Sequence, residues 1–133
     1  MPITVSHQDL INQALGHIKT LDVDDAVQRL EQEDTVFVDL RDPRELQREG
    51  KIPGAFHAPR GMLEFWVDPA SPYFKDIFGE DRTFVFYCQS GWRSALATKA
   101  VQDMGMDKVC HIGDGFRGWK DAGAPTEEVP AKK

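Results

Sequence analysis

Residues 83–94 read TFVFYCQSGWRS, an apolar run that ends at Cys88 and continues into a glycine-containing turn. A short run of β-branched and aromatic residues is typical of a strand that is buried on both faces. Residues 91–104 then carry alanine, valine and methionine at helical spacing, with Gly105 as a stop signal. The segment therefore predicts a buried strand that leads through a tight turn directly into a helix.

The rest of the chain alternates strands and helices in the same way. Further strands are predicted at residues 35–40, 55–58 and 108–112. Helix starts are predicted after Ser6, Asp22 and Asp42, and after the turn at residues 113–115. The aromatic-rich segment 59–79 is expected to be irregular. Strands that alternate with helices predict an α/β fold with a mostly parallel sheet.

Composition and charge indicate one globular domain. The 133 residues suffice for one domain, and 41% hydrophobic with 29% charged residues argues against disorder. The net charge of −6 argues against nucleic-acid binding, which needs a basic surface. No apolar run has the length of a membrane helix or a signal peptide, so a cytoplasmic protein without a membrane role is expected. Two cysteines are too few for a disulfide framework or a cysteine-rich zinc site, so no metal is expected.

Cys88 is the candidate nucleophile because it lies where the predicted strand meets the turn. In open α/β sheets, ligands bind at the carboxyl ends of the strands. A tight turn there directs main-chain N–H groups inward, and the following helix adds the positive end of its dipole. These donors and the Arg93 guanidinium favour the thiolate, which is the reactive form of a cysteine. The alternative is a core cysteine at a strand end with no chemical role.

Four separated motifs resemble those of single-domain rhodaneses, a sulfurtransferase family. They are Val38-Asp39-Leu40-Arg41-Asp42 with Glu45, Gly50-Lys51-Ile52-Pro53-Gly54-Ala55, the Cys88 turn, and Gly113-Asp114-Gly115-Phe116 with Trp119 and Ala122-Gly123-Ala124-Pro125. The resemblance implies a rhodanese-like α/β fold, with a five-stranded, mainly parallel sheet flanked by helices on both faces. The expected division is the rhodanese-like domain at residues 21–126, preceded by a helical N-terminal extension at 1–20 that lies outside the resemblance and followed by a polar tail at 127–133.

The resemblance also implies a reaction at Cys88. Its thiolate would take a sulfane sulfur from a donor such as thiosulfate, release sulfite, and pass the sulfur from a persulfide to cyanide, a thiol or an acceptor protein. No cofactor is implied. The turn residues that would bind the persulfide or an anionic donor are Gln89, Ser90, Gly91, Trp92, Arg93 and Ser94. This hypothesis requires a sulfur that is open to solvent and faces the main-chain amides of the turn.

Further residues are assigned supporting or structural roles. Asp39 and Arg41 end the first long predicted strand, and an ion pair or hydrogen bonds between them are expected to brace the turn. For Trp92, a pocket wall and simple packing both stay open. The same two interpretations apply to a second wall made of Arg60, Phe65 and Trp66. His57 and Cys110 are interpreted as structural, and a disulfide between the two cysteines is not expected in a reducing compartment.

Two other functions remain as alternatives. Cell-cycle dual-specificity phosphatases and some arsenate reductases resemble this family, but they place five residues between the cysteine and the arginine of their loop. Here Cys88 and Arg93 enclose four, which predicts a ring sized for one sulfur atom and negligible phosphatase activity. The other alternative is a rhodanese-like module that only binds a partner, or that relays sulfur to one dedicated protein.

Overall fold

Five parallel strands form one sheet in the centre of the molecule. The structure, a computed structural model, describes residues 1–131. The strand order is β1-β5-β4-β2-β3, and neighbouring strands pair in parallel. The strands are β1 (Lys19–Leu21), β2 (Thr35–Asp39), β3 (Phe56–His57), β4 (Thr83–Tyr87) and β5 (Val109–Ile112). The predicted fold class is confirmed, and β4, the strand that precedes Cys88, lies in the middle of the sheet.

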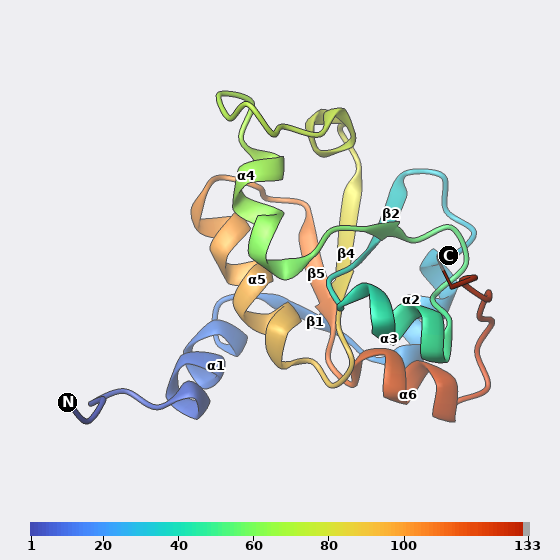
Figure 1. The fold of residues 1–133 in the computed structure, drawn as a ribbon, viewed down its shortest axis with the longest axis horizontal. Coiled ribbons are helices and arrows are strands. Elements are labelled where there is room, and N and C mark those ends of the chain that lie inside the picture. Colours follow the sequence, from blue (N-terminus) through green and yellow to red (C-terminus); the bar gives the residue numbers. More distant parts are fainter. Residues whose placement is uncertain (132–133) are drawn as a thin grey trace.

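Helices cover both faces of the sheet (Figure 1). One face carries α4 (Leu63–Val67) and α5 (Trp92–Asp103), and the other carries α2 (Val23–Arg29), α3 (Pro43–Glu49) and α6 (Gly115–Asp121). Short 3-10 helices occupy Arg60–Met62 and Asp76–Gly79. The first helix, α1 (His7–Leu15), packs against α5 rather than on the sheet itself. None of the helices in residues 1–131 has the length and apolar character needed to cross a membrane.

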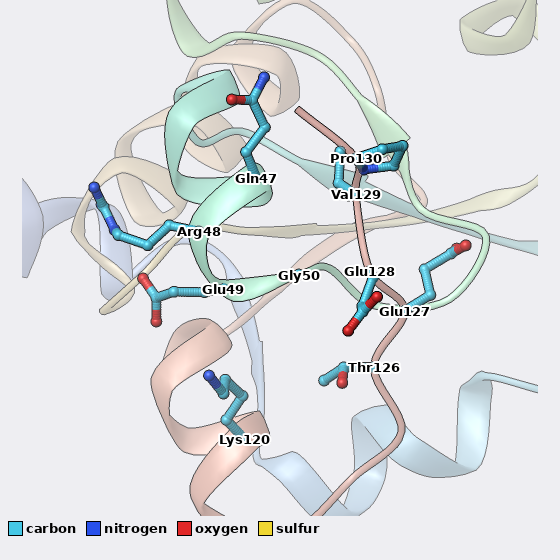
Figure 2. A pocket seen from close by; sticks show the side chains of 10 residues that line it. All are labelled: Gln47, Arg48, Glu49, Gly50, Lys120, Thr126, Glu127, Glu128, Val129 and Pro130. Carbon is cyan, nitrogen blue, oxygen red and sulfur yellow. The ribbon is translucent and has the colours of Figure 1, made fainter. Parts of the chain in front are cut away.

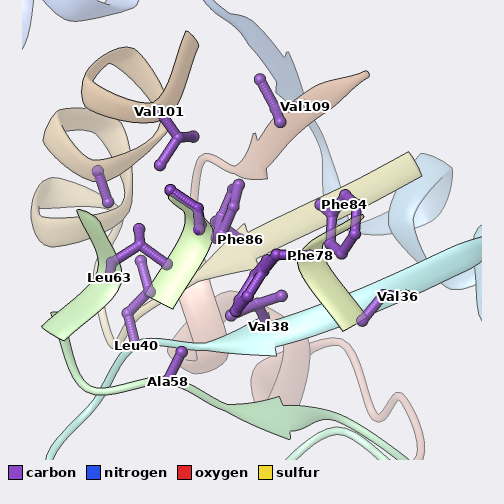
Figure 3. Close-up of a cluster of buried hydrophobic side chains, with 12 residues drawn as sticks. Val36, Val38, Leu40, Ala58, Leu63, Phe78, Phe84, Phe86, Val101 and Val109 are labelled. Carbon is purple, nitrogen blue, oxygen red and sulfur yellow. The ribbon is translucent and has the colours of Figure 1, made fainter. Parts of the chain in front are cut away.

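An apolar layer lies on each face of the sheet. On the α5 face, Phe84 and Phe86 of β4 pack in one cluster with Val101 of α5 (Figure 3). On the opposite face, Val85 of the same strand belongs to a cluster that contains Trp119 of α6. Successive side chains of a strand point to opposite faces. A strand with apolar residues on both faces, as β4 has at Phe84, Val85 and Phe86, therefore fills both layers, which fits its central place.

Capping boxes start two of the helices. Before α1, the Ser6 hydroxyl accepts a hydrogen bond from Asp9 N–H (3.0 Å), and the Asp9 carboxylate accepts one from Ser6 N–H (3.4 Å). Before α3, Asp42 accepts from Arg44 N–H (2.9 Å), and Glu45 accepts from Asp42 N–H (3.0 Å). These side chains pair N–H groups that the first turn of a helix leaves without partners. The predicted starts of both helices are confirmed.

Two elements differ from the sequence-based prediction. The edge strand β1 was not predicted, because only Leu21 of its three residues is buried and no alternation marks it. The helix α4 lies inside segment 59–79, which was expected to be irregular. It covers little more than one turn and buries Leu63 and Val67, which are four residues apart. Both elements depend on packing against distant parts of the chain rather than on a local pattern.

The flanking segments are attached to the sheet domain. β1 crosses the expected boundary between residues 20 and 21, so the N-terminal extension contributes to the sheet as well as a helix. The start of the expected tail is paired: Lys51 N–H donates to the Glu127 carbonyl (3.0 Å), and Glu127 N–H donates to the Lys51 carbonyl (2.9 Å). The last two tail residues, 132–133, lie outside the described residues.

Candidate active site

The Cys88 sulfur lies at the N-terminus of α5, directly after the carboxyl end of β4. Its Sγ accepts hydrogen bonds from the main-chain N–H groups of Gly91 (3.2 Å) and Ser94 (3.4 Å). The helix has no side-chain cap of its own, since its N-cap residue is Gly91. The sulfur therefore takes the place of the cap, in the positive field of the helix end, where a negative charge is stabilised. The predicted direction of the amides toward the sulfur is present.

A second turn supports this loop from behind. Gly91 has a φ of +92°, which favours glycine, and a Cβ there would collide with the carbonyl oxygen of Gly113. At the start of α6, Phe116 N–H donates to the carbonyl oxygen of Cys88 (2.8 Å). The turn at residues 113–115 thus fixes the main chain on which the sulfur is carried. This contact explains why one of the four motifs lies so far along the chain from the cysteine.

Cys88 is closed off from solvent, with an exposed fraction of 0%. The hypothesis from the sequence required an open sulfur, and this part of it is wrong for the conformation described. The physical reason is that Sγ is the acceptor for the first turn of a helix, so the turn that directs its N–H groups at the sulfur also folds over it. A donor can reach this sulfur only after the turn opens.

A chain of hydrogen bonds leads away from the sulfur. The Cys88 thiol donates to the Ser94 hydroxyl (3.6 Å), which is 2.9 Å from Nδ1 of His111. The other ring nitrogen, Nε2, is 2.9 Å from the Thr20 hydroxyl. His111 has an exposed fraction of 0%, and burial lowers its pKa to about 4, so the ring is neutral near pH 7. His111 is not among the site residues predicted from the sequence, although a polar residue on an inward face of a buried strand signals a hydrogen-bond partner.

Asp39 and Arg41 form a buried ion pair at the same edge of the sheet. Arg41 Nη2 is 2.7 Å from the Asp39 carboxylate, and both side chains have an exposed fraction of 0%. The guanidinium also donates to the Gln89 side-chain carbonyl (3.2 Å) and to the Gly50 carbonyl (2.8 Å). Burial by itself lowers the pKa of Arg41, but the hydrogen bond and charge of Asp39 outweigh it and raise the pKa. The expected ion pair is present, and it contacts the turn through Gln89.

Arg93 is not a free cation. It forms two hydrogen bonds with the Glu45 carboxylate, from Nη1 (2.8 Å) and Nη2 (3.0 Å). This pairing holds the pKa of Glu45 below its usual range and raises that of Arg93. The sequence predicts that Arg93 binds the persulfide or an anionic donor, and in this conformation its guanidinium is already paired with Glu45. A donor has to compete with Glu45, which is 48 residues away in the sequence.

The other turn residues make fewer contacts with the sulfur than expected. The Gln89 side chain points to Arg41 and donates to Glu49 (3.1 Å). Ser90 is exposed, and so is Trp92, whose ring lies 5.1 Å from that of His7. Of the six turn residues predicted, Gly91 and Ser94 hydrogen-bond Sγ in the described structure. Trp92 packs against α1, which favours the packing interpretation for this residue.

Most of the residues considered for a second pocket wall, or predicted to be structural, pair with or pack against other parts of the fold. Arg60 pairs with Glu64 (2.7 Å), and Trp66 packs on the core, whereas Phe65 is exposed. His57 Nε2 is 2.6 Å from the Arg41 carbonyl oxygen, as expected of a structural histidine. Cys110 is buried in β5 opposite Val85, and both cysteines are free. Burial raises the pKa of the Cys110 thiol, which makes it a poor nucleophile.

A hollow of about 610 Å³ lies between α3, α6 and the C-terminal segment (Figure 2). Its charged lining includes Arg48, Glu49, Lys120 and Glu127, and Cys88 is not among the lining residues. Glu49 also accepts the hydrogen bond from Gln89, so the hollow borders the turn without reaching the sulfur. The candidate nucleophile is thus outside this open space.

The parallel sheet, with a cysteine at the carboxyl end of its central strand and amides directed at the sulfur, defines an α/β protein with a cysteine-loop site. A model of the rhodanese-like domain matches residues 22–122. The chain therefore belongs to the family of rhodanese-like domains.

Three relatives illustrate the range of the family. The solved structure of RPA3614 from Rhodopseudomonas palustris, a protein of unknown function described as a possible tyrosine phosphatase, matches with a TM-score of 0.93 and 53% identity over 96% of this chain and 98% of that one. Thiosulfate sulfurtransferase GlpE of Shewanella oneidensis is 29% identical over 83% of this chain and 100% of that protein. The uncharacterized protein slr1261 of Synechocystis is 35% identical over 75% of this chain and 51% of that protein, so this chain spans about half its length.

Proposed function

We propose that this protein is a sulfurtransferase that carries a sulfane sulfur on Cys88. The observation that supports it best is the pair of main-chain N–H groups, from Gly91 and Ser94, directed at Sγ. Once the turn has opened and exposed Sγ, the Cys88 thiolate attacks the outer sulfur of thiosulfate. An S–S bond forms at Cys88, and the S–S bond of thiosulfate breaks as sulfite leaves with the electron pair. The persulfide anion then lies where fixed donors stabilise negative charge. A thiophilic acceptor (cyanide, a thiol or a protein) takes the outer sulfur, and the thiolate is restored.

The persulfide is tested by intact mass spectrometry after treatment with thiosulfate. We expect the mass of one extra sulfur atom, mapped to Cys88 and removed by cyanide. Cys88→Ser should not gain this mass, and Cys110→Ser should gain it as the wild type does, because Cys110 is buried in the sheet away from the turn. A wild-type protein that takes up no sulfur from thiosulfate or polysulfide would contradict the proposal.

A phosphatase is the second candidate, because RPA3614 is described as a possible tyrosine phosphatase. Two features argue against it: the turn has four residues between Cys88 and Arg93, and Arg93 is bound to Glu45. A tetrahedral oxyanion needs a wider ring of donors than one sulfur atom does. Hydrolysis of p-nitrophenyl phosphate that disappears in Cys88→Ser would favour the phosphatase over the sulfurtransferase.

The acceptor and the compartment are part of the same proposal. A persulfide carrier suits a reducing compartment such as the cytoplasm, where a thiol or an acceptor protein is available to take the sulfur. A module that only binds a partner would not need a cysteine with two N–H donors at the end of the central strand. A dedicated sulfur relay would differ from a general sulfurtransferase by turning over with one protein and not with cyanide.

Glu45→Gln is expected to lower the KM for thiosulfate about twofold to fivefold, the range set by a partly exposed ion pair. Glutamine keeps an oxygen that accepts the N-cap hydrogen bond from Asp42 N–H, but it frees the Arg93 charge for the dianionic donor. Arg93→Ala should raise the KM by a similar factor and weaken its dependence on salt. Steady-state kinetics of both variants at low and high ionic strength check this. Equal KM values in all three proteins would show that Arg93 does not contact the donor.

A further inference from the structure

The hydrogen-bond chain from Cys88 crosses three elements and ends at the surface. Ser94 comes from α5, His111 from β5 and Thr20 from the edge strand β1. Ser94 and His111 are fully buried, whereas Thr20 is exposed. β1 and β5 are in register so that Thr20 lies directly beside His111. The chain is therefore a continuous polar path from an enclosed sulfur to solvent.

Because Cys88 is buried, its thiol proton needs a route to solvent, and this path provides one. The thiol has to lose its proton before the sulfur can attack a donor. While the turn is closed the sulfur has no contact with water, so the proton can leave before the turn opens only through hydrogen-bonded groups. The thiol is the donor in its hydrogen bond with the Ser94 hydroxyl. When His111 carries its proton on Nε2, Ser94 donates to Nδ1 of His111 and Nε2 donates to Thr20. In this tautomer all the hydrogen bonds point in one direction, from the sulfur outward.

We propose that Ser94, His111 and Thr20 relay the proton of the Cys88 thiol to solvent. In one step the thiol proton passes to Ser94, the Ser94 proton to Nδ1 of His111, the Nε2 proton to Thr20, and the original Thr20 proton to water. The four groups begin with four protons and end with three, and one proton has left. The thiolate remains at Sγ with the Ser94 hydroxyl now donating to it. This inference rests on the proposed function, because it supplies the nucleophile for sulfur transfer.

His111 is suited to a relay rather than to the role of a terminal base. The ring exchanges its Nε2 proton for one at Nδ1 and is neutral at the start and at the end, so no charge is left on it. Burial, which lowers its pKa to about 4, disfavours an imidazolium and favours this exchange. In residues 1–131, no charged side chain hydrogen-bonds the ring, which lies between Ser94 and Thr20 and beside Phe86 of β4. His111 is thus a positioning residue that acts on Cys88 through Ser94.

The position of the proton on His111 is tested without any sulfur donor. In the wild-type protein labelled with ¹⁵N-histidine, NMR should show the Nε2–H tautomer when Cys88 is a thiol and the Nδ1–H tautomer when it is a thiolate. The thiolate is followed in the same samples by its ultraviolet absorbance. In Cys88→Ala the tautomer should not change over that pH range. A single tautomer throughout the wild-type titration would overturn the relay.

The exit is tested by a matched pair of variants at Thr20, an exposed position in the edge strand β1. Thr20→Val removes the hydroxyl but keeps the shape, and it should slow persulfide formation in rapid-quench experiments about tenfold to hundredfold without changing the KM. Thr20→Ser should restore the rate and its solvent isotope effect.

The two hypotheses fail in different ways. If the wild type forms persulfide and Thr20→Val forms it equally fast, the relay is overturned and the sulfurtransferase stands. If the wild type forms none, the proposed function fails, and the NMR titration decides on the relay by itself. A slow Thr20→Val with a fast Thr20→Ser supports both.

Discussion

Asp39→Asn is expected to lower the free energy of unfolding by about 3–5 kcal/mol, the usual cost of removing one partner from a buried ion pair. The Arg41 guanidinium would remain charged and enclosed, without the carboxylate that now accepts its hydrogen bonds. It also donates to Gln89, so the turn that carries Cys88 should loosen in the folded fraction. Chemical denaturation measures the first effect, and the rate of persulfide formation at low temperature measures the second.

Two controls separate this charge effect from general damage. Asp81→Asn makes the same chemical change in an exposed pair with Lys108 and should leave the denaturation midpoint unchanged. Arg41→Met combined with Asp39→Asn should cost less than the sum of the two single changes, because neither charge is then left alone. A single Asp39→Asn variant that is as stable as Asp81→Asn would show that the pair is not a principal brace.

Stability is expected to fall by about 3 kcal/mol between pH 6.5 and pH 4 because of His111. Its pKa is lowered from 6.5 to about 4 by burial, so the unfolded chain takes up a proton in this interval and the folded chain does not. Protonation therefore stabilises the unfolded state relative to the native state as the pH falls, and the contribution of His111 becomes constant only above about pH 7.5. Urea denaturation at several pH values checks the slope.

A histidine substitution identifies the source of this acid sensitivity. His111→Gln should flatten the curve between pH 6.5 and 4, whereas His17→Gln, at an exposed position, should leave it unchanged. Glu45 also loses a favourable interaction in acid, since the hydrogen bond from Arg93 lowers its pKa, but this loss begins only as the pH falls to the ordinary glutamate value of 4.5. Equal slopes in the wild type and His111→Gln would contradict the assignment.

The sequence was sufficient for the parts of the fold that local patterns determine. The capping box of α3 and the apolar run of β4 are each formed by residues close together in the sequence, and both predictions are confirmed. The edge strand β1 has no such pattern, because it is held by pairing with β5 about 90 residues later. The helix α4 depends in the same way on the core that it covers.

The same distinction between local patterns and contacts over long sequence distances applies to the candidate site. The position of Cys88 and the need for glycine at residue 91 follow from the motif and the turn. The pairing of Arg93 with Glu45, and the path through His111, involve side chains that meet only after the sheet has formed. Their residue types were visible in the sequence, but their partners were not.

The close approach of Gly91 to Gly113, and of Gly115 to the carbonyl of Gln89, joins two turns that are more than twenty residues apart. A protein engineer who exchanges residues 89–93 for the corresponding segment of a relative would place it against a surface shaped for another loop. Changing the donor preference of one family member to that of another therefore requires exchanging both turns, the Cys88 turn and residues 113–115, at the same time.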